Sequence, residues 1–278
     1  MGYVKFLGTA GARFVVARQL RFSAGTWIEL GETQLLLDPG PGTLLRARKS
    51  RPPLDPLRLD AVLLSHKHLD HSTDVNVVIE AMADGGYKRR GVLLAPADAL
   101  EGDDPVVLRY VHPFLERIET WRAGDKHEVG EVKIGPVPHT HGNVEAYGLV
   151  LDSPEGRIGF VTDVRFSADL ADRYAGCELL VLNVVLKDWR PGVDHLSLPE
   201  AGEIIAAVRP NLAVLTHFGT TMLRANPPRL AAAMTEQLGI RVVAAGDGLT
   251  VSASSWSGSS PRLPTVGGEA DNASGGGR

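Results

Sequence analysis

The sequence predicts one domain of the α+β class that spans residues 1–252. Several short apolar runs are compatible with β-structure and end at polar residues, which is typical of buried strands. Other segments have the spacing of amphipathic helices, and 44% of the residues are hydrophobic, enough for one large core. After Ser252 the composition changes to serine, glycine and proline, so we expect residues 253–278 to form a disordered tail.

The first part of the chain is expected to form strands joined by loops and two helices. In order, we predict strands at 1–8, 26–38 and 59–65, a short basic helix within 39–56, and a helix at 73–83. The loop 8–25 carries Arg13, Arg18 and Arg21, which either bind phosphate oxygens at a substrate rim or are solvated. The N-terminus of helix 73–83 would favour anionic ligands.

The second part of the chain is expected to contain further strands, two helices and two hairpins. In order, we predict a strand and turn at 92–100, a mobile flap or dimer face at 105–120, a hairpin at 144–163 with its turn at SPEG, a strand at 178–186, a helix between Pro199 and Pro210, a strand at 212–217, a helix after Pro228, and a hairpin at 241–253 with its turn at GDG.

Charge and cysteine content exclude several classes of protein. The net charge of −4 argues against a general nucleic-acid binder, which is usually basic. The one cysteine, Cys177, excludes an internal disulfide framework and fits a reducing compartment, so we expect a cytoplasmic protein. We find no signal-peptide pattern and no apolar run of 18 residues, so no membrane span is expected.

The most informative motif follows the predicted strand 59–65 and reads H-x-H-x-D-H, with His66, His68, Asp70 and His71. Imidazole and carboxylate are the ligands that zinc and similar cations prefer. Alternate residues after a strand can point the same way, so His66 and His68 could share one cation. Asp70 and His71, beyond the turn, could face a second cation. Two cations about 3.5–4 Å apart can clamp an attacking and a leaving oxygen.

Four ligands cannot complete two metal sites, and the chain supplies further candidates at the ends of later strands. They are His141, Asp163 and His217, each placed where the active sites of open sheets gather. His139 lies two residues before His141 and competes with it as a ligand. We prefer His141, because the strand that follows is then in the expected register.

At these residues the chain resembles the metallo-β-lactamase-fold hydrolases over about residues 2–252. The opening strand YVKFLGTAG, the strand LLLDPGPG around Asp38, and all the metal motifs stand in the order that the family shows. The resemblance implies an αββα four-layer sandwich that binds two Zn²⁺, with Mn²⁺ or Fe²⁺ as alternatives, and makes Asp38 a buried support of the histidine loop. It implies the following ligands: His66, His68 and His141 on one metal, Asp70, His71 and His217 on the other, and Asp163 between them.

Within the family, the chain is similar to ribonuclease Z and its phosphodiesterase relatives. The similarity rests on FLGTAG, on HGNVEAYG after His141, and on DHLSLPEA followed by AVLTHFG, and it makes His195 a catalytic residue beside the metals. Two features differ. Only residues 142–162 separate His141 from Asp163, which leaves no room for a long tRNA-binding arm, and Asn183 stands where the nuclease has a supporting glutamate.

The resemblance implies hydrolysis by a hydroxide that bridges the metals, with Asp70 orienting it and His195 protonating or stabilising the leaving oxygen. Thr162, Asn183 and Thr216 are candidate supporting residues. The expected substrate is a phosphodiester in a small molecule, a nucleotide or RNA. The alternatives are a thioester or lactone hydrolase of the same fold and a metal-binding protein without catalysis. Related enzymes are often dimers, so a homodimer is one expectation.

Overall fold

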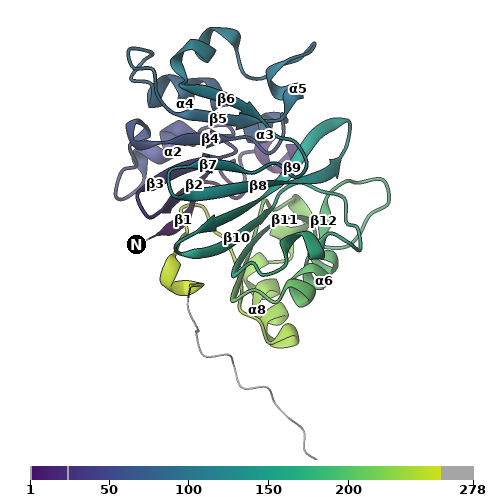
Figure 1. Cartoon of the computed structure of the whole chain (residues 1–278). Helices are drawn as coiled ribbons and strands as arrows, with labels where there is room; N and C mark the ends of the chain where they lie inside the picture. The colour runs from purple at the N-terminus through teal and green to yellow at the C-terminus, as the bar shows by residue number, and fades with distance from the viewer. Residues whose placement is uncertain (1, 24, 258–278) are drawn as a thin grey trace, which may run out of the picture.

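Two β-sheets pack face to face in the computed structural model, which describes residues 2–23 and 25–257 (Figure 1). The first sheet has seven strands, antiparallel from β15 to β3 and parallel from β3 to β6. In spatial order they are β15 (Thr250–Ser252), β1 (Tyr3–Phe6), β2 (Thr26–Leu30), β3 (Thr33–Leu37), β4 (Ala61–Leu63), β5 (Val92–Ala95) and β6 (Arg117–Thr120).

The second sheet has eight strands, parallel from β14 to β10 and antiparallel from β10 to β7. In spatial order they are β14 (Val242–Ala244), β13 (Leu212–Thr216), β11 (Leu179–Leu186), β10 (Gly156–Val161), β9 (Val144–Ser153), β8 (Val132–His141) and β7 (His127–Val129), with β12 (Leu196–Ser197) paired to β11. The predicted hairpin at 144–163 is present as β9 and β10, with Ser153 opposite Gly156.

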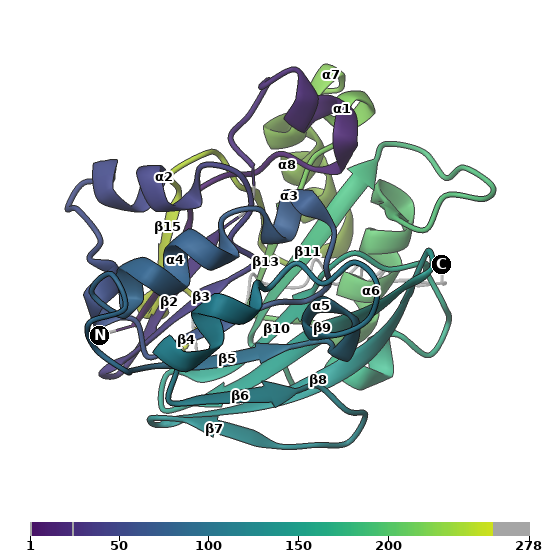
Figure 2. The same ribbon diagram turned by 90° about the horizontal axis from the view of Figure 1, so that it is seen from above.

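Helices cover the outer face of each sheet, α2 and α4 on the first and α6 and α8 on the second (Figure 2). The helices are α1 (Ala12–Ala17), α2 (Thr43–Lys49), α3 (Leu69–Ser72), α4 (Val75–Met82), α5 (Ala97–Leu100), α6 (Leu198–Val208), α7 (Thr220–Arg224) and α8 (Pro227–Leu238). Short 3₁₀ helices lie at Pro56–Arg58, Arg109–Phe114, Ala171–Tyr174 and Ala253–Ser255. The predicted αββα sandwich is therefore confirmed.

Three apolar clusters hold these four layers together. In β3, Leu35 and Leu37 pack into the core between the sheets, while Leu36 faces the outer helices. All five residues of this strand are buried, because both faces of its sheet are covered. This double coverage explains why the strands at the centre of the fold are continuous apolar runs rather than alternating patterns. No helix among residues 2–23 and 25–257 is long and apolar enough to cross a membrane.

Two of the sequence predictions about local structure are wrong. The expected loop 8–25 contains helix α1, whose short pattern ARFVVA has no acidic or hydroxyl residue at its start. The expected hairpin at 241–253 does not form, because β14 pairs with β13 in the second sheet and β15 pairs with β1 in the first. The segment 105–120, predicted to be a mobile flap or a dimer face, contains a 3₁₀ helix and β6, which pairs with β5 at the edge of the first sheet.

The folded part of the chain also continues beyond the predicted boundary at Ser252. Ala253–Ser255 form a 3₁₀ turn, and the Trp256 side chain is fully buried in the core between the sheets. The carbonyl of Trp256 accepts a hydrogen bond from the amide of Asn211 at 2.7 Å. Burial of this one large aromatic side chain thus extends the folded part of the chain into a segment with few hydrophobic residues. The rest of the predicted tail, residues 258–278, lies outside the described residues.

Cys177 gives a prediction about reactivity. Its side chain is 3% exposed, and burial raises the pKa of the thiol to about 11. At pH 8 roughly one thiol in a thousand would be ionised, compared with about a quarter for a free cysteine. We expect alkylation by iodoacetamide at pH 8 to be slowed at least about 100-fold in the folded protein relative to the protein in urea. Mass spectrometry measures the two alkylation rates, and equal rates in the folded protein and in urea would contradict this burial.

Candidate metal centre

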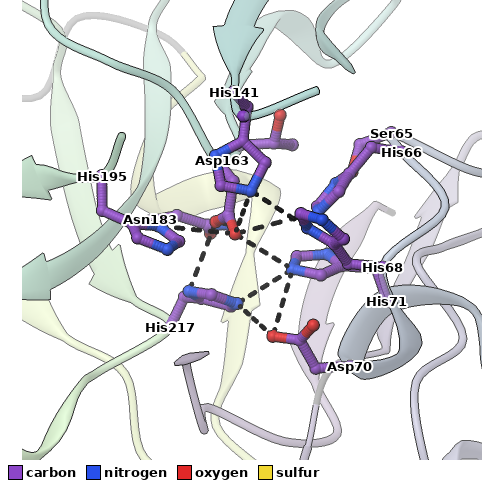
Figure 3. A network of polar contacts seen from close by, with 12 residues as sticks. Ser65, His66, His68, Asp70, His71, His141, Asp163, Asn183, His195 and His217 are labelled. Atoms are coloured by element: carbon purple, nitrogen blue, oxygen red, sulfur yellow. Dashed lines mark hydrogen bonds and ion pairs between the residues drawn. The ribbon is translucent and has the colours of Figure 1, made fainter. Parts of the chain in front are cut away.

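Histidine and aspartate side chains from both sheets converge at one edge of the sandwich (Figure 3). Most come from the end of a strand or from the loop that follows it, and Asp70 and His71 lie on the short helix α3 beyond the turn. The converging residues are His66, His68, Asp70 and His71 after β4, His141 at the end of β8, Asp163 after β10, His195 before β12, and His217 after β13. The structure therefore brings together every residue that the sequence analysis preferred as a ligand or catalytic group.

Asp38 organises the loop that carries the first motif. In the parallel pair of β3 and β4, Leu37 lies beside Leu63, which places Asp38 next to the start of the histidine loop. Its Oδ1 accepts the backbone N–H of Ser65 at 2.7 Å, and its Oδ2 accepts the Ser65 hydroxyl at 2.7 Å. Oδ2 also accepts Nδ1–H of His71 at 2.8 Å. Asp38 thus holds both ends of the loop and does not itself join the cluster.

These hydrogen bonds fix which ring nitrogen faces the centre. His71 donates from Nδ1 to Asp38, so in its neutral form its Nε2 presents a lone pair. The Ser65 hydroxyl donates to Asp38 and therefore accepts from Nδ1 of His66, at 3.0 Å, which leaves Nε2 of His66 as an acceptor. His141 donates from Nδ1 to the carbonyl of Asp194 at 2.8 Å. Three rings are therefore held with Nε2 free to bind a cation.

Asp163 lies at the middle of the cluster. Its Oδ1 accepts a hydrogen bond from Nδ2 of Asn183 at 2.9 Å, which orients the carboxylate. Its Oδ2 lies close to four imidazole nitrogens that belong to four different residues. The distances are 3.5 Å to His71 Nε2, 3.6 Å to His141 Nε2, 3.6 Å to His195 Nδ1 and 3.9 Å to His66 Nε2.

His217 and Asp70 complete the far side of the cluster. Nε2 of His217 lies 2.9 Å from Nε2 of His71 and 3.4 Å from Oδ2 of Asp70. The backbone of His217 has a φ of 57°, and Asp38 has a φ of 52°, both in the left-handed region. L-residues rarely adopt this conformation, and it is concentrated at functional sites. A Cβ at Gly11 would lie 2.5 Å from Nδ1 of His217, so glycine is required where the 8–25 segment passes this ring.

The donor atoms fall into groups of the size that a cation needs. His66, His68 and His141 form one group, and Asp70, His71, Asp163 and His217 form another, with all donor atoms of each group within 4.8 Å of one another. Two buried ring nitrogens, Nε2 of His66 and Nδ1 of His217, have no hydrogen-bond partner. Buried polar atoms without partners are costly, so their presence here fits a bound cation. The residues present thus fit two divalent metals.

The electrostatics of the cluster favour the protonation states that His66, His68, Asp70 and Asp163 need as ligands. Burial lowers the pKa of His66 and, together with the neighbouring His141, that of His68, so both rings are neutral at pH 7. Burial opposes ionisation of Asp70, but the charges of His71 and His217 outweigh it and lower the pKa of this carboxyl. The pKa of Asp163 is lowered in the same way by His217, His195 and His71. In contrast, the carboxylates of Asp70, Asp38 and Asp163 outweigh burial and raise the pKa of His71 well above its usual value, so a cation that binds this ring must displace a proton.

His195 reaches the centre from the loop between β11 and β12. Its Nδ1 is buried without a hydrogen-bond partner and lies 3.6 Å from Oδ2 of Asp163. Burial lowers the pKa of this ring to about 4. His195, His141 and Asp163 also form a third group of donor atoms within 4.8 Å. The side chain therefore stands in the cluster itself.

His139, the competing ligand, points elsewhere. Its Nε2 makes a 2.8 Å hydrogen bond with the hydroxyl of Tyr174, and its Nδ1 lies 3.3 Å from the carbonyl of Asp163. A Cβ at Gly148 would collide with this pair, so the glycine makes room for it on β9. The preference for His141 over His139 agrees with this geometry, and His139 supports the backbone behind Asp163.

The basic residues suggested as a substrate rim are partly structural. Arg21 donates from Nη1 to the hydroxyl of Thr9 at 2.9 Å and to the carbonyl of Ala245 at 3.4 Å. Two further arginines, Arg89 and Arg90, donate to backbone carbonyls of neighbouring segments. Such contacts tie loops together, because each guanidinium reaches several carbonyls at once.

Of the suggested supporting residues, Asn183 contacts Asp163, whereas Thr162 donates to the carbonyl of Tyr147 at 2.8 Å. Thr216 lines a small cavity that His71 and His217 also line. Two further residues, Ser65 and Asp194, hydrogen-bond to histidines of the cluster, and the sequence analysis does not identify them. Both are adjacent to a motif histidine, and this adjacency is the only signal of them that the sequence contains.

A family model places the fold and this cluster in a known group. The model described as the β-lactamase superfamily domain matches residues 33–218, about two thirds of the chain. The chain belongs to this superfamily. The matched range includes both halves of the candidate centre, from Asp38 to His217, and the superfamily consists mostly of metal-dependent hydrolases. The predicted relationship to metallo-β-lactamase-fold proteins is confirmed.

Individual relatives cover nearly the whole chain. The uncharacterized protein MJ1374 of Methanocaldococcus jannaschii is 31% identical over 251 residues, which span 88% of this chain and 93% of that protein. A ribonuclease Z of Methanopyrus kandleri is 26% identical over 290 residues, spanning 89% of this chain and 96% of that protein. The crystal structure of YhfI, a metallo-β-lactamase-fold protein of Bacillus subtilis, superposes with a TM-score of 0.72 at 20% identity and covers 90% of this chain and 98% of that one.

Proposed function

We propose that this superfamily member is a dinuclear, zinc-dependent phosphodiesterase. One observation carries the proposal. His195 enters the cluster and lies 3.6 Å from Asp163, and it belongs to the segment DHLSLPEA through which the chain resembles ribonuclease Z. A ribonuclease Z similar over 89% of this chain gives independent support for phosphodiester chemistry. The proposed ligands of one metal are His66, His68 and His141, and those of the other are Asp70, His71 and His217, with Asp163 shared.

The chemistry follows from the positions of the side chains. Two divalent cations, when bound, lower the pKa of water towards neutrality and offset the charge that develops on a phosphoryl oxygen. Asp70 is partly exposed and ionised, so its carboxylate can accept a hydrogen bond from the attacking water and orient it. His195 is neutral at pH 7 because burial lowers its pKa, so it can stabilise the leaving oxygen by donating a hydrogen bond.

The proposed substrate is a small or nucleotide-like phosphodiester. Residues 142–162, between His141 and Asp163, are taken up by β9, its turn and β10. They contain no extended arm that could hold a folded tRNA away from the active site. A substrate whose phosphodiester can reach the cluster without being held by an arm of the protein fits this arrangement. The chain's net charge of −4 also fits a compact substrate better than an extended polyanion.

His195→Ala tests the catalytic half of the proposal. We expect turnover of bis(p-nitrophenyl) phosphate to fall about 100-fold or more, because the leaving oxygen loses its donor. We expect the metal content to stay at the wild-type value, since the other donor groups do not need this ring. Metal analysis of the purified variant accompanies the rate measurement. Loss of metal would show that His195 is a ligand or a structural support instead.

The substrate class is tested by a panel of three ester types on the zinc-loaded protein. The panel contains bis(p-nitrophenyl) phosphate, a thioester and a lactone. The proposal expects metal-dependent hydrolysis of the phosphodiester at a rate well above those of the other two. Hydrolysis of only the thioester or lactone would reassign the chain to acyl hydrolysis. Metal binding without turnover of any of the three would favour a non-catalytic metal-binding protein.

A further inference from the structure

The loop that delivers His195 is held near its end by Asp194. It leaves β11 at Leu186 and runs to β12 at Leu196, and Trp189 on it is 64% exposed. Near its end the loop turns inward, and the Asp194 side chain is only 15% exposed. His195 follows directly and enters the cluster. The contacts that hold Asp194 in place therefore determine where His195 lies.

Asp194 binds the strand end that carries His141 through two of its acceptors. Its backbone carbonyl accepts Nδ1–H of His141 at 2.8 Å, and its Oδ2 accepts the N–H of Gly142 at 3.0 Å. The first bond fixes the tautomer of His141 and aims its Nε2 at the cluster. A shift of the Asp194 backbone would change the orientation of this proposed ligand as well as that of His195.

The third acceptor of Asp194 binds Arg165. Nε of Arg165 donates to Oδ1 of Asp194 at 2.6 Å, and this contact lowers the pKa of the Asp194 carboxyl. The backbone N–H of Arg165 donates to the carbonyl of Thr140 at 2.8 Å. Arg165 lies two residues after Asp163. The segments that carry His141, Asp163 and His195 therefore meet at one ion pair.

We propose that Asp194 is a positioning residue of the active site and that Arg165 holds it, so that one latch sets both the ring of His141 and the approach of His195. The proposal rests on the proposed hydrolytic function. The ion pair adds little to global stability, because the Arg165 side chain is 61% exposed and such pairs are weak in water. Its effect is local, since it closes the loop onto two groups of the centre.

The test uses Arg165→Met, which keeps the aliphatic stem and removes the guanidinium, and Asp194→Asn, which weakens the carboxylate contacts. We expect the zinc affinity and kcat to fall about 10- to 100-fold in both, as is typical when the partner of a metal ligand is removed. KM should change little. In the metal-free protein, the exchange-protected Nδ1–H signal of His141 should be lost from the imidazole NMR spectrum. Arg165→Lys should restore part of each quantity.

Arg48→Met provides the control. Arg48 lies on α2, away from the cluster, and makes a similar exposed ion pair with Asp55 at 3.1 Å. It should leave zinc affinity, the His141 signal and kcat unchanged. The double variant of Arg165 and Asp194 should be no worse than the worse single variant, because both residues act through one contact.

Wild-type zinc affinity and an intact His141 signal in Arg165→Met would overturn the latch. A fall in all readouts together with a large drop in Tm would also overturn it, because the role would then be structural. If the wild-type protein hydrolyses no phosphodiester, the proposed function fails, but the zinc and NMR readouts still decide the latch.

Discussion

Replacing His68 with alanine is expected to abolish hydrolysis without unfolding the protein. The ring supplies one of three nitrogens in its donor group, and its Nδ1 lies 3.1 Å from Nε2 of His141. Loss of a cation from this group should lower kcat/KM at least about 1000-fold, which corresponds to about 4 kcal/mol of transition-state stabilisation. The measurement is a rate assay together with metal analysis of the same sample.

The fold should survive this change because the backbone of His68, not its ring, holds the loop. Its carbonyl accepts the N–H of His71 at 2.9 Å and the hydroxyl of Ser72 at 3.0 Å, and alanine keeps both bonds. His112→Gln is the matched control, since His112 lies on the 3₁₀ helix Arg109–Phe114 and takes no part in the cluster. Retention of two metals and full activity in His68→Ala would remove His68 from the ligand set.

The second large effect is expected at Asp38, where two substitutions separate stability from metal binding. Asp38→Ala removes the acceptor of three buried hydrogen bonds, from Ser65 N–H, the Ser65 hydroxyl and His71 Nδ1–H. Each buried donor without a partner costs about 1–3 kcal/mol, so we expect the free energy of unfolding to fall by at least about 3 kcal/mol. Urea unfolding of the metal-free protein measures this loss.

Asp38→Asn should retain more stability but still lose a metal. Its amide oxygen can accept from Ser65 N–H, and asparagine tolerates the left-handed φ of 52° better than alanine does. Its NH₂ group, however, cannot accept Nδ1–H of His71. The ring should then carry its proton on Nε2, which blocks binding of a cation there. Two bound metals in the asparagine variant would show that Asp38 does not set this tautomer.

Most residues of the centre could be predicted because they stand at or just after a recognisable strand end. The motif at His66–His71 and the later residues His141, Asp163 and His217 follow apolar runs whose ends meet at one edge. Parallel pairing explains this convergence for β4, β10 and β13, whose apolar patterns indicate the strands. His141 instead ends β8, which is antiparallel to both of its neighbours. Pattern and chemistry agree at these positions, so the sequence alone points to the site.

The supporting residues could not be predicted, because their roles depend on register and on tertiary contacts. Ser65 acts through its register beside Asp38. Asp194 acts through its backbone carbonyl and its carboxylate, whose partners His141 and Arg165 lie far from it in the sequence. The error at residues 241–253 has a similar origin. Short apolar runs around GDG are typical of a hairpin, yet they equally suit a chain that leaves one sheet and joins the other.

The most direct test of the central claim is a metal titration of the metal-free protein, with hydrolysis of bis(p-nitrophenyl) phosphate followed at each addition of zinc. If the cluster around Asp163 is a dinuclear centre for phosphodiester hydrolysis, activity should rise and level off near two equivalents of zinc per chain. Failure to bind zinc or manganese, or two bound equivalents without any phosphodiester hydrolysis, would contradict the account.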